Sequence, residues 1–301
     1  MVKPKTRLHR FRRDGEAIRK IALTVRDKEV IRQVARFRFL RSQQICNLVK
    51  GASAQILRRL QALYHHGYLD RPRCQIDFYH RGGSHPMVYG LAKRGAALMR
   101  REFDIPFREL EWTDKPNSVG RIFLEHTLMV AEGLIAVQTT CLASKGAVRY
   151  LSAEELGVVA PFRWNVTVQV RRLGLVPDGV FGLEYRDALP EHSRVICFLE
   201  ADRGTMPITR SNPHLSCFAR KLDAYMALWK RGEFEKKFGT RRVAVHTVTE
   251  TAERASNIAA AVAKLPQGRG LFACHVLAEI TPIATAILQH ASPRDKNLKS
   301  C

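Results

Sequence analysis

Residues Leu175–Leu183 read LVPDGVFGL, and residues Val195–Thr205 read VICFLEADRGT. Each stretch joins an apolar run, of the kind that forms a buried strand, to acidic side chains at one end. The acids are Asp178, Glu200 and Asp202. Carboxylates that meet at the ends of neighbouring strands can hold a divalent metal ion. These two stretches therefore predict neighbouring buried strands and a candidate metal site at their ends.

The charge of the whole chain favours a polyanionic partner. The 301 residues include 50 Lys and Arg against 28 Asp and Glu, a formal net charge of +22. A protein that neutralises phosphates releases their condensed counterions, so this excess favours nucleic acid. Charge alone does not identify a partner, and a merely basic protein stays an alternative. The length suits two domains, and 46% hydrophobic residues are enough for a core.

The sequence shows no signal for export or membrane insertion. No run of about 18 apolar residues is present, and no apolar segment follows the basic N-terminus MVKPKTRLHRFRR. The seven cysteines are scattered without a CxxC pair, which is typical of reduced thiols. We therefore expect a cytoplasmic bacterial protein with no membrane partner. Residues 1–25 are expected to form a basic arm that follows a phosphate backbone.

Residues 26–102 are expected to form a winged helix-turn-helix domain. Three successive segments have apolar residues at helical spacing: RDKEVIRQVARFRF, LRSQQICNLV and GASAQILRRLQALYHHGYL. Ser42 and Ser53 are expected to be the N-caps of the second and third helices, with Gly51 in the turn between them. Two strand-like segments around the tip RGGS then predict a β-hairpin wing.

The third helix, Ser53–His66, is expected to enter a major groove of double-stranded DNA. The candidate contacts on this helix and on the wing are Ser53, Gln55, Arg58, Arg59, Arg71, Arg73, Arg81 and His85. Arg58 and Arg59 are expected to reach bases or phosphates, and the residues around the wing are expected to reach phosphates. Some winged helices bind proteins or dimerise instead, so that role stays open.

The rest of the chain predicts a second domain. Residues 103–118 read as a linker, and residues 119–285 run from a long apolar helix through strands to alternating helices and strands. This order predicts an α/β domain with a mixed sheet and helices on both faces, so the whole chain is α+β. RWNVTVQVRR and LVPDGVFGLEY are each expected to be one strand. Residues 286–301 are expected to be a disordered tail.

The acids resemble the pattern of the PD-(D/E)xK superfamily, whose domains have a restriction-endonuclease-type fold. Pro177 and Asp178 match its first part, and Glu200 matches its second acid. The resemblance implies a DNA endonuclease in which Asp178, Glu200 and Asp202 bind Mg²⁺, or Mn²⁺ in its place, through hard oxygen ligands. Such a metal polarises the scissile phosphate and lowers the pKa of the attacking water.

One position departs from this pattern. Two residues after Glu200, where the superfamily has a lysine, this chain has Asp202, which cannot stabilise a developing negative charge. Strand alternation places Glu200 and Asp202 on the same face of the sheet. Lys221, on the next helix, is the favoured replacement, whereas Arg203 is expected to point away. The expected catalytic residues are Asp178, Glu200, Asp202 and Lys221.

From Arg26 to about Leu277 the chain is similar to the replication-relaxation family of plasmids and other mobile elements. The matching positions are His126, Asp178, Gly179, Glu200, Asp202, Arg203, Gly204, Thr205, Lys221 and Tyr225. The resemblance implies a role in the replication, relaxation or mobilisation of plasmid or integrative-element DNA. A second copy of the chain and other mobile-element proteins are the protein partners that we consider.

Other functions stay open at this stage. Pro-Asp-Gly is also an ordinary turn signal, and Glu200 and Asp202 can form a structural ion-pair network with Arg203, Arg210 or Lys221. The protein would then be a non-catalytic DNA-binding regulator or replication initiator. It could also be a subunit of a transposition or mobilisation complex that is active only with a partner. The sequence contains no P-loop, HExxH or GxSxG motif.

Overall fold

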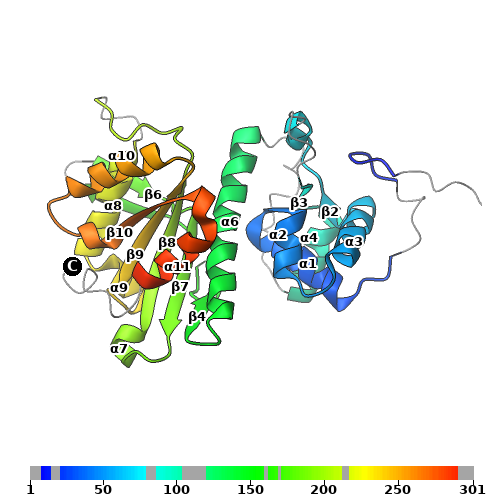
Figure 1. The fold of residues 1–301 in the computed structure, drawn as a ribbon, viewed down its shortest axis with the longest axis horizontal. Coiled ribbons are helices and arrows are strands. Elements are labelled where there is room, and N and C mark those ends of the chain that lie inside the picture. Colours follow the sequence, from blue (N-terminus) through cyan, green and yellow to red (C-terminus); the bar gives the residue numbers. More distant parts are fainter. Residues whose placement is uncertain are drawn as a thin grey trace, which may run out of the picture. The chain divides into compact units, whose positions relative to one another are not determined.

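A computed structural model describes residues 8–14, 21–78, 86–103, 120–158, 162–168, 171–211 and 217–290 (Figure 1). The chain divides into two compact units, Met1–Ala131 and Glu132–Cys301. The division falls inside one long helix, α6 (Arg121–Ala143). Both units contain helices and strands, so the structure is mixed α and β, in agreement with the expected class.

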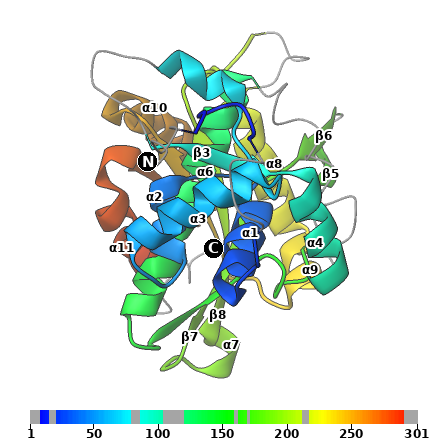
Figure 2. The ribbon, with the colours of Figure 1, turned by 90° about the vertical axis from the view of Figure 1, so that its right-hand side faces the viewer.

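The first unit alternates helices with short strands. Its elements before α6 are α1 (Val25–Phe37), β1 (Phe39–Arg41), α2 (Ser42–Leu48), α3 (Ser53–His65), β2 (Leu69–Asp70), η1 (Arg73–Phe78), β3 (Val88–Leu91) and α4 (Lys93–Phe103). The strands pair antiparallel in the order β1-β3-β2. Figure 2 shows α2 and α3 together with α1, α4 and this small sheet.

The helix positions follow from capping and periodicity. Thr24 caps α1, because its side chain accepts a hydrogen bond from the backbone of Asp27, whose carboxylate accepts one from the backbone of Thr24. The predicted apolar face of α1 is buried, as is that of α3 around Leu60. Ser42 and Ser53 are the first residues of their helices and not the predicted N-caps. The backbone N–H of Ser42 donates to the carbonyl of Met87, one position beyond the pairing of Arg41 with Val88, so the contact with the β3 side continues into the first residue of α2.

The predicted wing is only partly within the described residues. β2 and β3 pair antiparallel, as expected for a hairpin. The segment after β2 is the 3₁₀ helix η1, and within it the side chain of Gln75 bonds both backbone groups of Val88. This side chain takes the place of further ladder bonds, so β2 stays short. The tip RGGS lies outside the described residues.

The second unit is built around a five-stranded mixed sheet. After α6 its elements are β4 (Val148–Leu151), β5 (Trp164–Val168), β6 (Arg171–Leu175), β7 (Gly179–Tyr185), α7 (Pro190–Ser193), β8 (Arg194–Asp202), α8 (Phe218–Lys230), α9 (Glu233–Phe238), β9 (Val243–Thr249), α10 (Ala252–Ala263), η3 (Arg269–Leu271), β10 (Phe272–Val276), η4 (Leu277–Glu279) and α11 (Ile280–His290). The strand order is β10-β9-β8-β7-β4. β8, β9 and β10 are parallel, and β7 is antiparallel to β8 and β4.

Helices cover both faces of this sheet, as predicted (Figure 1). On one face a Cβ atom on Gly133 of α6 would stand 2.9 Å from Leu199, so glycine permits a close approach of helix and strand. α11 lies on the same face, where Tyr185 donates to the carbonyl of Leu288. On the other face Phe198 packs with Tyr225 of α8. Successive residues of β8 therefore point alternately at α6 and at α8.

Two expectations about the second domain are wrong. The segment RWNVTVQVRR is not one strand, because it contains all of β5 and the start of β6, which form a separate hairpin. Its inward residues, such as Val166, pack with α8. Residues 169 and 170, between the two strands, are Gln and Val, so no Gly, Pro or Asn signals the turn there. The tail was expected to be disordered from residue 286, yet α11 continues to His290 and Ile287 is fully buried.

By length and composition α6 could cross a membrane, contrary to the expectation drawn from apolar runs. However, 44% of its most apolar window is buried within the structure. Leu124 and Leu128 pack with Phe39 and Val88 in the first unit. A core helix of a soluble protein passes the same test, so α6 is weak evidence for a membrane span.

Candidate functional site

Two acids and a lysine meet at the edge of the sheet where β8 ends and β7 begins. Asp178 directly precedes β7, Glu200 lies near the end of β8, and Lys221 is on α8. The Lys221 Nζ contacts Glu200 Oε2 and lies 3.8 Å from Asp178 Oδ2. The antiparallel pairing of Gly179 with Leu199 places the two acids at neighbouring positions. The three residues are brought together by two strands and one helix.

Each acid has a further hydrogen bond that orients it. Asp178 Oδ2 accepts from the backbone N–H of Ala201 at 2.9 Å. The Tyr225 hydroxyl donates to Glu200 Oε1 at 2.6 Å, so both oxygens of Glu200 have a donor. Tyr225 follows Lys221 by one helical turn, and both therefore lie on the same face of α8.

Burial changes the protonation of this group of residues. The Glu200 side chain is 2% exposed, and desolvation raises its pKa to about 8 against the attraction of Lys221. For Lys221, desolvation alone would lower the pKa, but attraction to Glu200 and Asp178 outweighs it and raises the pKa. Lys221 therefore carries a positive charge at neutral pH and lies between the carboxyl groups of Asp178 and Glu200.

Asp202 does not join these residues. Arg254 of α10 donates to both of its carboxylate oxygens, at 3.1 and 2.8 Å, and the backbone N–H of Gly204 adds a third bond. Glu200 and Asp202 share a face, but two residues along a strand separate them by about 7 Å. Glu200 therefore meets α8, while Asp202 meets α10.

The expected set of three metal ligands is therefore not formed. Within the described ranges no group of three or more His, Cys, Asp and Glu side chains is placed to hold a metal ion. Asp178 and Glu200 alone still fit Mg²⁺ or Mn²⁺ in donor type, because these ions prefer carboxylate oxygens. Their oxygens already share one cation, the ammonium group of Lys221.

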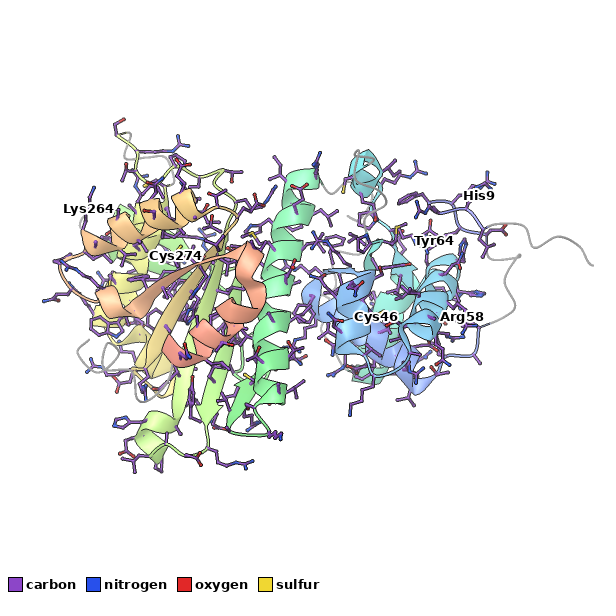
Figure 3. All side chains as sticks on the ribbon, viewed as in Figure 1. His9, Cys46, Arg58, Tyr64, Lys264 and Cys274 are labelled. Atoms are coloured by element: carbon purple, nitrogen blue, oxygen red, sulfur yellow. The ribbon has the colours of Figure 1, made fainter. Side chains whose placement is uncertain are left out.

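On the first unit, the front half of α3 carries the expected exposed residues. Ser53, Gln55 and Arg58 are exposed. Arg58, marked on α3 in Figure 3, donates through Nε to the carbonyl of Ala54 at 3.3 Å. Arg58 is exposed, so its side chain is accessible to a ligand.

A family comparison covers both of these regions. The family model for replication-relaxation matches residues 31–243. The chain belongs to the replication-relaxation family. The match includes α3, Asp178, Glu200 and Lys221, and the family indicates a role in the replication or relaxation of plasmid or mobile-element DNA. Searches of curated proteins and of solved structures found no match.

Two expected DNA contacts of this family member instead bond or stack within the first unit. Arg59 donates to both oxygens of Asp27, at 2.8 and 2.5 Å, and Asp27 is fully buried. Arg71 is 6% exposed and stacks on Tyr64 and Tyr89, 4.1 and 5.1 Å from their ring centroids. Both arginines hold the first unit of this replication-relaxation protein together, because their partners come from distant parts of the chain.

The remaining expected contacts have mixed outcomes. Arg73 is exposed in η1, whereas Arg81 and His85 lie outside the described residues. The described part of the basic arm packs on its own unit: Arg13 donates to the carbonyl of Tyr64, and the backbone of Asp14 donates to His65. This part of the arm was expected to follow a phosphate backbone.

Three residues near these sites were missed or given no role from the sequence. Tyr225 was named only as a position that matches the family and was given no role, although its spacing of four residues from Lys221 could have indicated that both act on the same group. Arg254 had no sequence signal, because its approach to Asp202 depends on the parallel pairing of β8 with β9. Arg26, which donates to Gln55 at 3.2 Å, was also missed.

Proposed function

We propose that this protein binds plasmid or mobile-element DNA and hydrolyses its phosphodiester backbone. The observation that carries this proposal is the convergence of Asp178, Glu200 and Lys221 at one edge of the sheet. Two carboxylates can hold a divalent metal ion that polarises a phosphodiester, and an ammonium group can stabilise the negative charge that develops during hydrolysis.

The order of elements in the first unit supports a winged helix-turn-helix domain. A helix, a strand, two helices, two strands and a helix follow one another, and the strands form one antiparallel sheet. A short connection with Gly51 in a left-handed conformation joins α2 to α3. The exposed front half of α3 would then enter a major groove, and the net charge of +22 supports binding to a polyanion.

The second unit supports a PD-(D/E)xK-type domain. Apart from the β5–β6 hairpin and the short helices α7 and α9, the chain runs α6, β4, β7, β8, α8 and β9. The three strands β4, β7 and β8 are antiparallel, and β9 returns parallel to β8 after a helix. Asp178 and Glu200 occupy two of the expected catalytic positions, and α8 supplies the lysine.

Each residue has a defined role in this proposal. Asp178 and Glu200 would hold a divalent metal ion, which would polarise the scissile phosphate and lower the pKa of a bound water. Lys221 stays protonated because of its acidic neighbours, and stabilises negative charge on the phosphate that is cleaved. Tyr225 donates to Glu200 and fixes the orientation of its carboxylate.

A plasmid assay tests the proposal. Supercoiled plasmid with the cognate origin is incubated with the protein in Mg²⁺ and then in Mn²⁺, and nicked and linear products are measured. Asp178→Ala, Glu200→Gln and Lys221→Met are expected to abolish cleavage while the protein still binds DNA. Glu184→Gln is the matched control, since Glu184 lies on β7, the strand that follows Asp178, but pairs with Arg149 and Arg194 at the other end of that strand. Cleavage by all three variants would exclude this site.

A second function is favoured by two ion-pair arrangements. Asp202 is neutralised by Arg254, and Lys221 already occupies the space between the two acids. A non-catalytic regulator or replication initiator with a structural ion-pair network would look the same. Tight, salt-sensitive DNA binding without cleavage in either metal would support it, and cleavage only with an added partner would indicate a subunit of a larger complex.

A further inference from the structure

We propose that Arg26 of α1 acts with Gln55 and Arg58 of α3 as a surface that recognises guanine in the major groove. This inference rests on the proposed DNA binding by α3, and it assigns the base specificity of that helix. Arg26 belongs to a different helix from the other two residues, and its hydrogen bond to Gln55 brings it to the front of α3, the helix that also carries Arg58.

Two independent contacts fix the position of Arg26. Its Nη1 donates to Gln55 Oε1 at 3.2 Å. Its guanidinium also lies over Gly51, where a Cβ atom would come within 2.9 Å of Arg26 Cζ. Gly51 has a φ of 141°, a conformation that strongly favours glycine. The glycine between α2 and α3 therefore leaves space for Arg26 to reach the recognition helix.

The bond to Arg26 decides which hydrogen-bonding groups Gln55 presents. A guanidinium can only donate, so the amide oxygen of Gln55 must face Arg26. The amide nitrogen then points outward with its two N–H groups. A glutamine whose amide is not otherwise bonded recognises adenine with two hydrogen bonds, one accepted by its oxygen and one donated by its nitrogen. The bond from Arg26 to the Gln55 oxygen prevents this pairing. The Arg26–Gln55 pair therefore presents donors alone.

Guanine is the base that matches such a surface. Its major-groove edge has two acceptors, O6 and N7, whereas the edge of adenine has one acceptor and one donor. Arg58 follows Gln55 by three residues on α3, is exposed, and adds further donors on the same side of the helix. Arg59, the other arginine of α3 that was expected to contact bases, forms an ion pair with Asp27. Arg58 is therefore the arginine of α3 that we assign to base recognition.

The test is a selection from a library of randomised DNA duplexes with the full-length protein at fixed salt. The wild type is expected to enrich guanine at one or two adjacent positions. Arg26→Ala and Gln55→Ala are expected to lose roughly tenfold in affinity for the selected duplex, the size of one bidentate base contact. Arg26→Lys keeps the charge but not the planar fork, and is expected to lose most of the guanine preference.

Arg32→Ala is the matched control, because Arg32 is also an exposed arginine of α1 but bonds Glu29. It removes the same charge and is expected to leave the base preference unchanged. Melting temperatures of all variants check that they fold. Tight binding without guanine enrichment, or a guanine preference that survives in Arg26→Ala, would overturn the inference. Absence of salt-sensitive binding to any duplex would instead overturn the proposed DNA binding, and the inference with it.

Discussion

Arg254 on α10 and Asp202 at the end of β8 form a nearly buried ion pair with two hydrogen bonds. Their side chains are 14% and 6% exposed, and the N···O distances are 3.1 and 2.8 Å. This pair connects the parallel strand β8 to the first turn of α10. It also turns Asp202 away from Asp178 and Glu200, which separates a structural acid from the two candidate metal ligands.

Asp202→Ala is expected to lower the free energy of unfolding by about 3 kcal/mol, because it leaves Arg254 buried without its carboxylate. Arg254→Ala is expected to cost a similar amount. The double variant is expected to recover part of the loss, since neither charge is then left unpaired. Urea denaturation measures all three. If Asp202→Ala kept full stability but weakened Mn²⁺ binding, Asp202 would be a metal ligand after all.

Arg59→Ala is expected to destabilise the first unit by about 3 kcal/mol, because Asp27 is fully buried and would keep only its bonds to Thr24. The adjacent Arg58→Ala is the control for stability. It is expected to change the free energy of unfolding by less than about 0.5 kcal/mol, since Arg58 is exposed.

The same two variants separate folding from DNA binding. Arg58→Ala is expected to weaken DNA binding and, if it loses a phosphate contact, to reduce the salt slope by about 1. Arg59→Ala is expected to bind normally at temperatures where it is folded. Binding titrations at several salt concentrations measure this, and equal effects of the two changes would contradict the assignment of Arg59 to a structural ion pair with Asp27.

Tyr225→Phe is expected to reduce DNA cleavage, because Glu200 Oε1 loses its donor while it remains buried. The loss of this bond is expected to cost about 1–3 kcal/mol of stability. Tyr185→Phe is a matched control, since its hydroxyl also makes one hydrogen bond of 2.6 Å, to the carbonyl of Leu288. Both changes are expected to lower stability, but Tyr185→Phe is expected to retain cleavage. Equal cleavage rates at equal stability would show that Tyr225 does not position Glu200.

The stability of the protein is expected to fall as the pH rises from about 4.5 to about 8. Burial raises the pKa of Glu200 from its ordinary value of 4.5 to about 8, so the folded state keeps a proton that the unfolded state has lost. The slope for one such group is at most about 1.4 kcal/mol per pH unit. The pKa of Lys221 is also raised, but this lysine is protonated in both the folded and the unfolded protein throughout this pH range, so it adds no pH dependence.

Glu200→Gln removes this titration and is expected to flatten the pH dependence between those two values. The difference between wild type and variant cancels the contribution of histidines, which titrate in the same range. Chemical denaturation at several pH values measures both proteins. Parallel curves for the two would show that Glu200 is ionised in the folded protein throughout that range.

The order and type of most elements could be predicted from the sequence. The apolar face of α1, the continuous apolar run of β8 and the amphipathic pattern of α8 are local features, and each element formed where its pattern predicted. The β5–β6 hairpin and the end of α11 were missed, because the hairpin lacks a turn signal and the last turn of α11 is stabilised by the burial of Ile287.

For the candidate site, the sequence by itself determined that Asp178 and Glu200 stand at strand ends and that Lys221 lies on the helix that follows, since hydrophobic periodicity acts over a few residues. Only the tertiary structure decided which charged groups meet. Asp202 pairs with Arg254 across 52 residues, and Arg59 pairs with Asp27 across 32. Such pairs depend on how strands and helices pack, and the free energy of burying a charge then selects the partner that compensates it.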